Sequence, residues 1–278
     1  MSFTVELVLV WVAIVAYAAS SACFTIGTIV GRPKAEEWAV RLAVAGLAAH
    51  AFAVVTRWIR IGHGPYIGFY EVASLLAFVA VAAFLVLVIR YRGVRVAGLA
   101  IMPVAFLIMG GSLLVNKEAQ AVTGALASFW LAIHVLFANL AFGAYAAGFV
   151  LAVAFLMKDA GAGRRWAALL DRFPEQDVLD TLTYRVVGAG FVFQGIMIAT
   201  GSIWANQAWG RYWGWDPVET WSLIAWAIYA IYLHLTLTLG WRGQKAAWVA
   251  ILALPVSLFS LLGVPIAYNS IHGAYLAL

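Results

Sequence analysis

The chain has 278 residues, of which 65% are hydrophobic and only 10% are charged. Soluble domains average about 25% charged residues, so this composition excludes an ordinary soluble protein and indicates an integral membrane protein. The net charge of +5 does not indicate a nucleic-acid partner, because the basic residues lie between apolar runs. The single cysteine, Cys23, excludes an internal disulfide framework or a CxxC pair.

Long apolar stretches follow one another along the chain. A helix needs about 20 mainly apolar residues to cross the hydrocarbon core, because its backbone groups must pair within the segment. Eight stretches qualify, at 4–30, 38–60, 70–90, 96–115, 127–157, 180–203, 218–240 and 246–267. We therefore expect an all-α integral membrane protein of about eight transmembrane helices, with residues 1–278 forming a single domain. The first stretch is too long for the apolar part of a cleaved signal peptide, so we interpret it as a permanent span.

Basic residues predict the orientation. Only four basic residues fall on one side of the predicted spans, Arg57, Arg60, Lys117 and Arg211. The other thirteen fall on the opposite side: Arg32, Lys34, Arg41, Arg90, Arg92, Arg95, Lys158, Arg164, Arg165, Arg172, Arg185, Arg242 and Lys245. Cytoplasmic loops carry the excess of basic residues, so the side with thirteen is predicted to be cytoplasmic. Both termini and the loops at 61–69, 116–126 and 204–217 are then outside, in a plasma membrane or a thylakoid membrane.

The one long inner connection, 158–179, has an amphipathic pattern. Four apolar residues recur at helical spacing, Trp166, Leu169, Leu170 and Phe173. Three arginines lie beside them, Arg164, Arg165 and Arg172. This pattern predicts a helix that lies in the membrane interface and ends at Pro174. Anchoring on anionic membrane lipid is the simplest role for it, and docking of a partner protein is the alternative.

The loop at 204–221 reads WANQAWGRYWGWDPVETW and is rich in tryptophan. Five of the 13 tryptophans lie in these 18 positions: Trp204, Trp209, Trp213, Trp215 and Trp221. A belt of tryptophans at the membrane–water boundary explains one or two at a helix end, but it does not explain five. Gly210 and Gly214 allow the backbone to fold so that several indoles face one object. Such a surface suits a flat apolar ligand, and a porphyrin fits that description.

Asp216 stands at the predicted start of the seventh span. With Pro217 at the first helical position and Glu219 three residues on, it forms a capping box. Capping alone would account for Asp216. A second task, such as accepting a hydrogen bond from a ligand histidine or fixing the loop, remains open.

Five histidines are candidate ligands of haem iron. His134 lies about 10 Å below the outer end of the fifth span, and His272 follows the last span, so both are predicted on the side of the tryptophan-rich loop. His234 lies deep in the seventh span, and with His50 it is a candidate for an inner haem station. His63 is interpreted as a turn residue. Whether His50 or His63 binds haem stays open.

Arginines near the outer boundary have two interpretations. Arg57 is expected to extend its side chain to lipid headgroups. Alternatively, Arg57, Arg60 and Arg211 could pair with haem propionates, because guanidinium binds carboxylate through two hydrogen bonds.

At WGRYWGWDPVETW the sequence resembles the cytochrome c assembly family, whose members share a tryptophan-rich "WWD" loop for haem handling. The similarity is strongest to the CcsA, or ResC, branch, the haem-attachment subunit of the second cytochrome c maturation system. It extends to DTLTYR at 180–185, to the run 201–234 and to GVPIAYNSIHGAY at 263–275. One departure is the stretch PYIGFYEV at 65–72, where the family has a PxSNxYES-like sequence.

The resemblance implies a function and a set of site residues. It implies that haem b is bound outside the membrane between His134 and His272, against Trp209, Trp213, Trp215 and Asp216, with His234 at a membrane site. It implies a haem-binding subunit of a cytochrome c haem lyase, with apocytochrome c and a separate CcsB (ResB) membrane protein as partners. Two alternatives remain: a haem transporter or chaperone without ligation activity, and a b-type electron-transfer cytochrome.

Overall fold

The computed structural model describes residues 2–114, 122, 124–160, 167 and 169–270. Within these residues eight helices are long and apolar enough to cross a membrane, and all regular structure is helical. The predicted all-α membrane architecture is therefore confirmed. The helices group into two compact units, unit 1 and unit 2, which are described separately. The prediction of a single domain over 1–278 stays a prediction.

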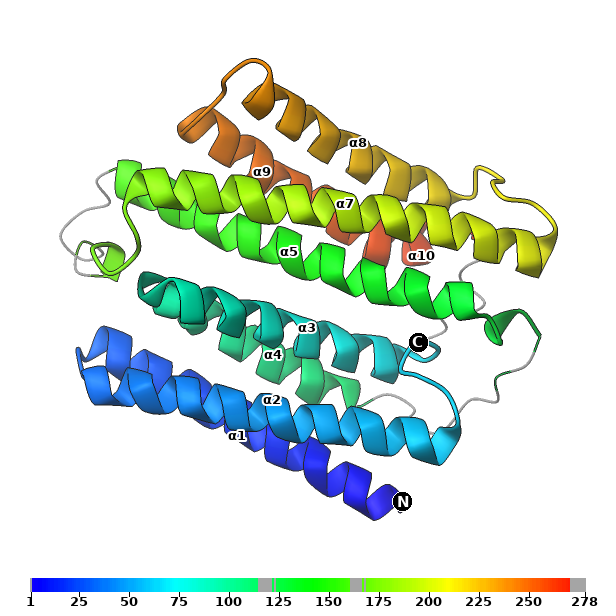
Figure 1. Ribbon diagram of the computed structural model, residues 1–278, viewed down its shortest axis with the longest axis horizontal. Helices are drawn as coiled ribbons and strands as arrows, with labels where there is room; N and C mark the ends of the chain where they lie inside the picture. The colour runs from blue at the N-terminus through cyan, green and yellow to red at the C-terminus, as the bar shows by residue number, and fades with distance from the viewer. Residues whose placement is uncertain (1, 115–121, 123, 161–166, 168, 271–278) are drawn as a thin grey trace. The chain divides into compact units, whose positions relative to one another are not determined.

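Unit 1 consists mainly of the first four long helices, coloured blue to teal in Figure 1. They are α1 (Phe3–Ile29), α2 (Pro33–Ile61), α3 (Phe69–Arg90) and α4 (Gly98–Ser112), with the short η1 (Arg92–Ala97) before α4. The sequence provides their ends: Ser2 caps α1, Pro33 is the first residue of α2, and Gly62 ends α2 in the left-handed conformation. Helices α1 and α2 pack along their whole length, and α4 packs on α1.

Unit 2 contains the later helices, green to red in Figure 1. They are α5 (Phe129–Asp159), α7 (Gln176–Trp209), α8 (Pro217–Leu237) and α9 (Gln244–Leu258), followed by the π-helical η3 (Phe259–Gly263) and α10 (Val264–Ala267); the short η2 (Gly124–Leu126) precedes α5. Helices α5 and α7 form the most extensive pair, and α9 packs on α5 and α8.

Polar contacts identify the two ends of unit 2. At one end, Trp204 Nε1 donates to the carbonyl of Ala125 at 2.7 Å, and Ser128 Oγ donates to Gln207 at 2.7 Å. At the other end, Arg242 pairs with Asp180 at 3.3 Å. The first end carries the tryptophan-rich segment, and the second carries basic residues of the side that the sequence predicts to be cytoplasmic.

The predicted interfacial helix at 158–179 is described only in part. Trp166, Arg164 and Arg165 lie outside the described residues, and Leu170 is buried. Arg172 pairs with Glu36 and donates to the carbonyls of Gly27 and Thr28 at 3.2 and 3.1 Å. Those carbonyls belong to the last turn of α1, which lacks helical partners for them. Arg172 therefore caps a helix of unit 1, and the anchoring of 158–179 on anionic lipid stays a prediction.

Candidate functional site

The tryptophan-rich segment is an irregular loop over a shorter range than 204–221. Helix α7 continues to Trp209, Gly210 ends it with a φ of +72°, and α8 starts at Pro217. Trp204 is buried at 3% exposure within α7, and Trp209 meets it edge-on, with ring centroids 4.9 Å apart. Trp204 is thus part of the packed end of unit 2 and does not lie on the surface of the loop.

The tip of the loop presents exposed aromatic rings. Trp215 is 68% exposed and Tyr212 is 59% exposed, and the rings of Trp213 and Trp215 meet at an angle of 89°. Trp215 has a φ of +55°, the only positive value for a non-glycine residue in the described part of the chain. An L-residue in this conformation costs about 1–3 kcal/mol and is typical of functional sites. The surrounding contacts must therefore hold it there.

Glu219 and Asp216 provide those contacts. One carboxylate oxygen of Glu219 accepts from the backbone N–H of Gly214 at 2.8 Å and of Asp216 at 3.1 Å. Asp216 in turn accepts from the N–H of Val218 at 3.0 Å, which completes the predicted capping box. The guanidinium of Arg211 lies against Gly214, where any side chain would collide with it. The loop is thus fixed by its own helix cap.

Asp216 has a second partner. Ser270 Oγ donates to Asp216 Oδ1 at 2.7 Å, and Asp216 is only 8% exposed. The aspartate therefore fixes the chain that follows the last span onto the loop. His272 lies outside the described residues, two positions after this anchor in the sequence.

His134 lies in the second turn of α5 and points at α7. Its Nδ1 donates to the carbonyl of Met197 at 2.8 Å. Because a carbonyl only accepts, this hydrogen bond places the proton on Nδ1 and the lone pair on Nε2. A metal-binding histidine has the same arrangement, in which the second nitrogen donates to a carbonyl and orients the ring.

Gly201 makes room for this ring. A Cβ at Gly201 would lie 2.5 Å from His134 Nδ1 and 2.8 Å from Cε1, closer than real contacts allow. The sequence alone did not identify Gly201 or Ser270 as site residues. Both residues lie in segments that resemble the family, Gly201 in 201–234 and Ser270 in 263–275. That resemblance could have pointed to them.

His234 lies in the last turn of α8 and is exposed on the surface of unit 2. Its Nδ1 is 3.3 Å from the hydroxyl of Thr238. The helix separates it from Asp216 by 18 residues, or about 27 Å, so it lies far from the loop.

Comparison with known proteins gives a consistent result. The family model described as "Cytochrome C assembly protein" matches residues 66–272, which is most of the 278-residue chain. The chain belongs to the cytochrome c assembly protein family. It is 34% identical over 232 residues to the "Cytochrome c biogenesis protein CcsA" of Chlamydomonas reinhardtii, covering 79% of this chain and 63% of that protein. It is 31% identical over 277 residues to the protein of the same name from Synechococcus elongatus, covering 83% and 85%.

The fold is also that of a solved structure. The "Cytochrome c Heme Lyase CcmF" superposes with a TM-score of 0.66 at 16% identity, covering 98% of this chain and 48% of that one. At this identity the likeness concerns the fold alone. The chain spans about half the length of that protein and less than two thirds of the Chlamydomonas relative.

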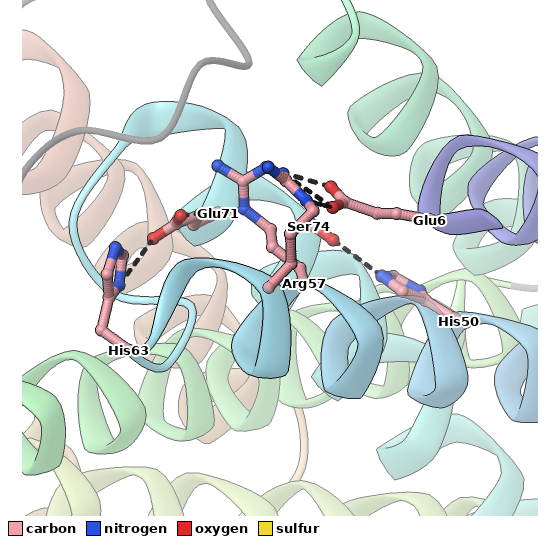
Figure 2. Close-up of polar contacts among 7 residues, drawn as sticks. Glu6, His50, Arg57, His63, Glu71 and Ser74 are labelled. Carbon is pink, nitrogen blue, oxygen red and sulfur yellow. Dashed lines mark hydrogen bonds and ion pairs between the residues drawn. The ribbon is translucent and has the colours of Figure 1, made fainter. Parts of the chain in front are cut away.

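One end of unit 1 contains a cluster of buried charged side chains. Figure 2 shows Arg57 between two carboxylates, Glu6 of α1 at 3.0 Å and Glu71 of α3 at 2.9 Å. Arg60 adds a second ion pair to Glu6 at 2.8 Å. Arg57 is 5% exposed, and both carboxylates are 2% exposed. The expectation that Arg57 extends to headgroups is therefore wrong, because its guanidinium satisfies the acidic groups of two neighbouring helices.

This cluster explains part of the altered stretch at 65–72. Its surviving family positions include Tyr70 and Glu71. Glu71 forms the ion pair with Arg57, and the ring of Tyr70 lies 4.7 Å from the same guanidinium. Two of the three matching positions, Tyr70 and Glu71, therefore contact Arg57, and the third is Pro65. Glu6 was not identified from the sequence, although an acidic residue inside an apolar span was a signal for it.

The two remaining histidines belong to unit 1. His50 is fully buried, with Nδ1 3.2 Å from the hydroxyl of Tyr17 and Nε2 2.8 Å from that of Ser74. Both ring nitrogens are therefore used within the helix bundle. His63 Nδ1 donates to the carbonyl of Gly64 at 2.8 Å and lies 4.0 Å from Glu71 (Figure 2). His50, a candidate for an inner haem station, packs in the core of unit 1, whereas His63 contacts the turn after α2, the role that the sequence predicted for it.

Proposed function

We propose that this protein takes part in cytochrome c biogenesis by binding haem b at the loop end of unit 2 and presenting it to apocytochrome c. The observation that carries the proposal is the orientation of His134 by the carbonyl of Met197. It directs the lone pair to Nε2, the atom that would bind iron. Membership of the cytochrome c assembly family and the names of the CcsA relatives support the same function.

The second ligand in this proposal is His272. Ser270 is bound to Asp216, so the chain reaches the loop two residues before this histidine. The exposed ring of Trp215 and the half-buried rings of Trp213 and Trp209 would form the apolar platform for the macrocycle. Imidazoles from α5 and from the tail would then approach the flat ligand from two sides.

The contribution of the protein is positioning. Haem supplies the iron and two vinyl groups, and a CxxCH segment of the apocytochrome supplies two thiols. Each S–H adds across one vinyl double bond, which forms a C–S bond, places the proton on the other vinyl carbon and requires no net oxidation. His134 and the loop hold the ligand so that the vinyl edge is accessible to the thiols. His234, exposed on α8, would serve a membrane haem site completed by a CcsB (ResB) protein.

The orientation predicted from the basic residues completes this proposal. The loop and both termini lie on the outer face of a plasma or thylakoid membrane, where apocytochrome c is available. Haem would reach His234 first and the loop site afterwards.

Absorption spectroscopy of the purified protein tests the proposal. The wild type should show the spectrum of bis-imidazole haem, and the double variant His134→Gly plus His272→Gly should lose it, with recovery on addition of free imidazole. Unchanged haem content in the double variant would contradict the outer site. Reconstitution with CcsB and a CxxCH peptide then separates the alternatives, because only a synthase subunit yields a thioether product, whereas a transporter yields haem transfer without one.

A further inference from the structure

We propose that the end of unit 1 opposite Arg57 contains a binding site for the phosphate of an anionic phospholipid headgroup. A cavity of about 370 Å³ opens there between α2 and η1. Its walls carry three arginines, one glutamate and one aliphatic residue: Arg41, Arg92, Arg95, Glu37 and Val40. Three positive charges and one negative charge leave the walls with a net charge of +2.

The arginines of this cavity share its wall with one carboxylate, that of Glu37. Among the described residues, none of the three forms an ion pair, whereas Arg57, Arg60, Arg172 and Arg242 do. The Nε atom of Arg95 is buried and has no hydrogen-bond partner in the described part of the chain. A buried charged donor without an acceptor is costly, and native structures normally satisfy it. An anion in the cavity would place acceptor oxygens beside the three guanidinium groups of its walls.

The position of the cavity favours a lipid over a soluble anion. The ring of Trp38 is 56% exposed, and the guanidinium of Arg41 lies 5.1 Å from its centroid. Exposed tryptophan beside arginine at the end of an apolar helix is typical of the headgroup level. Basic pockets between transmembrane helices on the cytoplasmic side bind anionic headgroups, and the basic residues predict this side for the cavity. The guanidinium fork also matches the phosphate oxygens geometrically.

The test uses the full-length protein in nanodiscs of phosphatidylcholine with increasing phosphatidylglycerol, with bound lipid counted by native mass spectrometry. We expect the variant Arg41→Gln plus Arg92→Gln plus Arg95→Gln to bind phosphatidylglycerol on the order of a hundredfold more weakly, at about fivefold for each charge removed. Lys34→Gln is the matched control, because Lys34 is exposed, lies on the same end of α2 and is not part of the cavity wall. Its affinity should equal that of the wild type.

Two further variants and one competitor complete the test. Arg95→Lys keeps the charge but removes the guanidinium fork, so its affinity should be intermediate. The double variant Arg41→Gln plus Arg92→Gln leaves the half-buried Arg95 in place, so binding can be measured even if the triple variant does not fold. Equal binding by the wild type and the double variant, or equal binding of phosphatidylcholine and phosphatidylglycerol, would overturn the proposal. Displacement of the lipid by millimolar inorganic phosphate would assign the site to a soluble anion instead. Haem content should not change in any of these variants.

Discussion

Ser270 donates a hydrogen bond of 2.7 Å to Asp216, and this bond joins the C-terminal tail to the start of α8. The same aspartate caps α8 through the N–H of Val218. One carboxylate therefore sets both the direction of the helix and the attachment of the tail. In the proposed function this attachment determines where His272 can act.

The variant Ser270→Ala tests the attachment. Loss of a hydrogen bond to a charged group should weaken haem binding at the proposed outer site by about tenfold, with little change in thermal stability. Ser270→Thr keeps the hydroxyl and should behave as the wild type. Haem titration followed by the absorption of bis-imidazole haem measures both. Equal affinities in the alanine and threonine variants would show that the tail is held in another way.

Gly201 provides a test of the His134 position. In Gly201→Ala the new methyl group would lie 2.5 Å from His134 Nδ1, so the ring must shift from the position in which it donates to Met197. We expect haem content to fall about tenfold, although alanine favours a helix by about 1 kcal/mol over glycine. Gly188→Ala on the same helix is the control, since its methyl group would meet Leu233 at an ordinary 3.8 Å. Normal haem content in Gly201→Ala would show that haem binding does not require the position of His134 seen here.

The buried charge cluster predicts a stability effect without a haem effect. Glu71→Gln removes one carboxylate from Arg57 and leaves a buried charge poorly compensated, which should cost about 3–5 kcal/mol of folding free energy. Glu175→Gln removes an exposed carboxylate and should leave the stability unchanged. Thermal unfolding in detergent compares the two. Equal unfolding temperatures for the two variants would contradict the prediction that the buried Arg57 needs the carboxylate of Glu71.

His50 and His134 should respond differently to the same substitution. His50→Ala leaves the buried hydroxyls of Tyr17 and Ser74 without their partner, at a cost of about 2 kcal/mol or more, and folded protein should keep its haem spectrum. His134→Ala should change the haem spectrum with a smaller effect on stability. A loss of haem ligation in folded His50→Ala would instead support the b-type cytochrome alternative.

The sequence predicted the helices well because a membrane imposes a length and an apolar composition that leave few alternatives. The predicted span 127–157 corresponds to α5 (Phe129–Asp159), and 70–90 corresponds to α3 (Phe69–Arg90). The capping box at Asp216 was also predictable, since it depends on residues three positions apart.

Contacts between distant residues were not predictable from local pattern. Arg57 has the sequence context of a residue at a helix end that reaches headgroups, and its partner Glu6 is 51 positions away. Trp204 is one of the five tryptophans of the segment 204–221, but the helical register of α7 turns it into the interior. In both cases packing between helices, which no local spacing records, decides the role of the side chain.

The π-helical segment η3 has a consequence for the tail. A π turn contains one residue more than an α turn, and each residue of an α-helix advances the chain by about 100°. Removing one residue from 259–263 would restore ordinary winding and rotate everything after it by roughly that angle. Ser270 would then leave Asp216 although neither side chain had been altered. The direction of the tail thus depends on the number of residues in η3, so a deletion in that segment can separate Ser270 from Asp216 without any substitution in the loop.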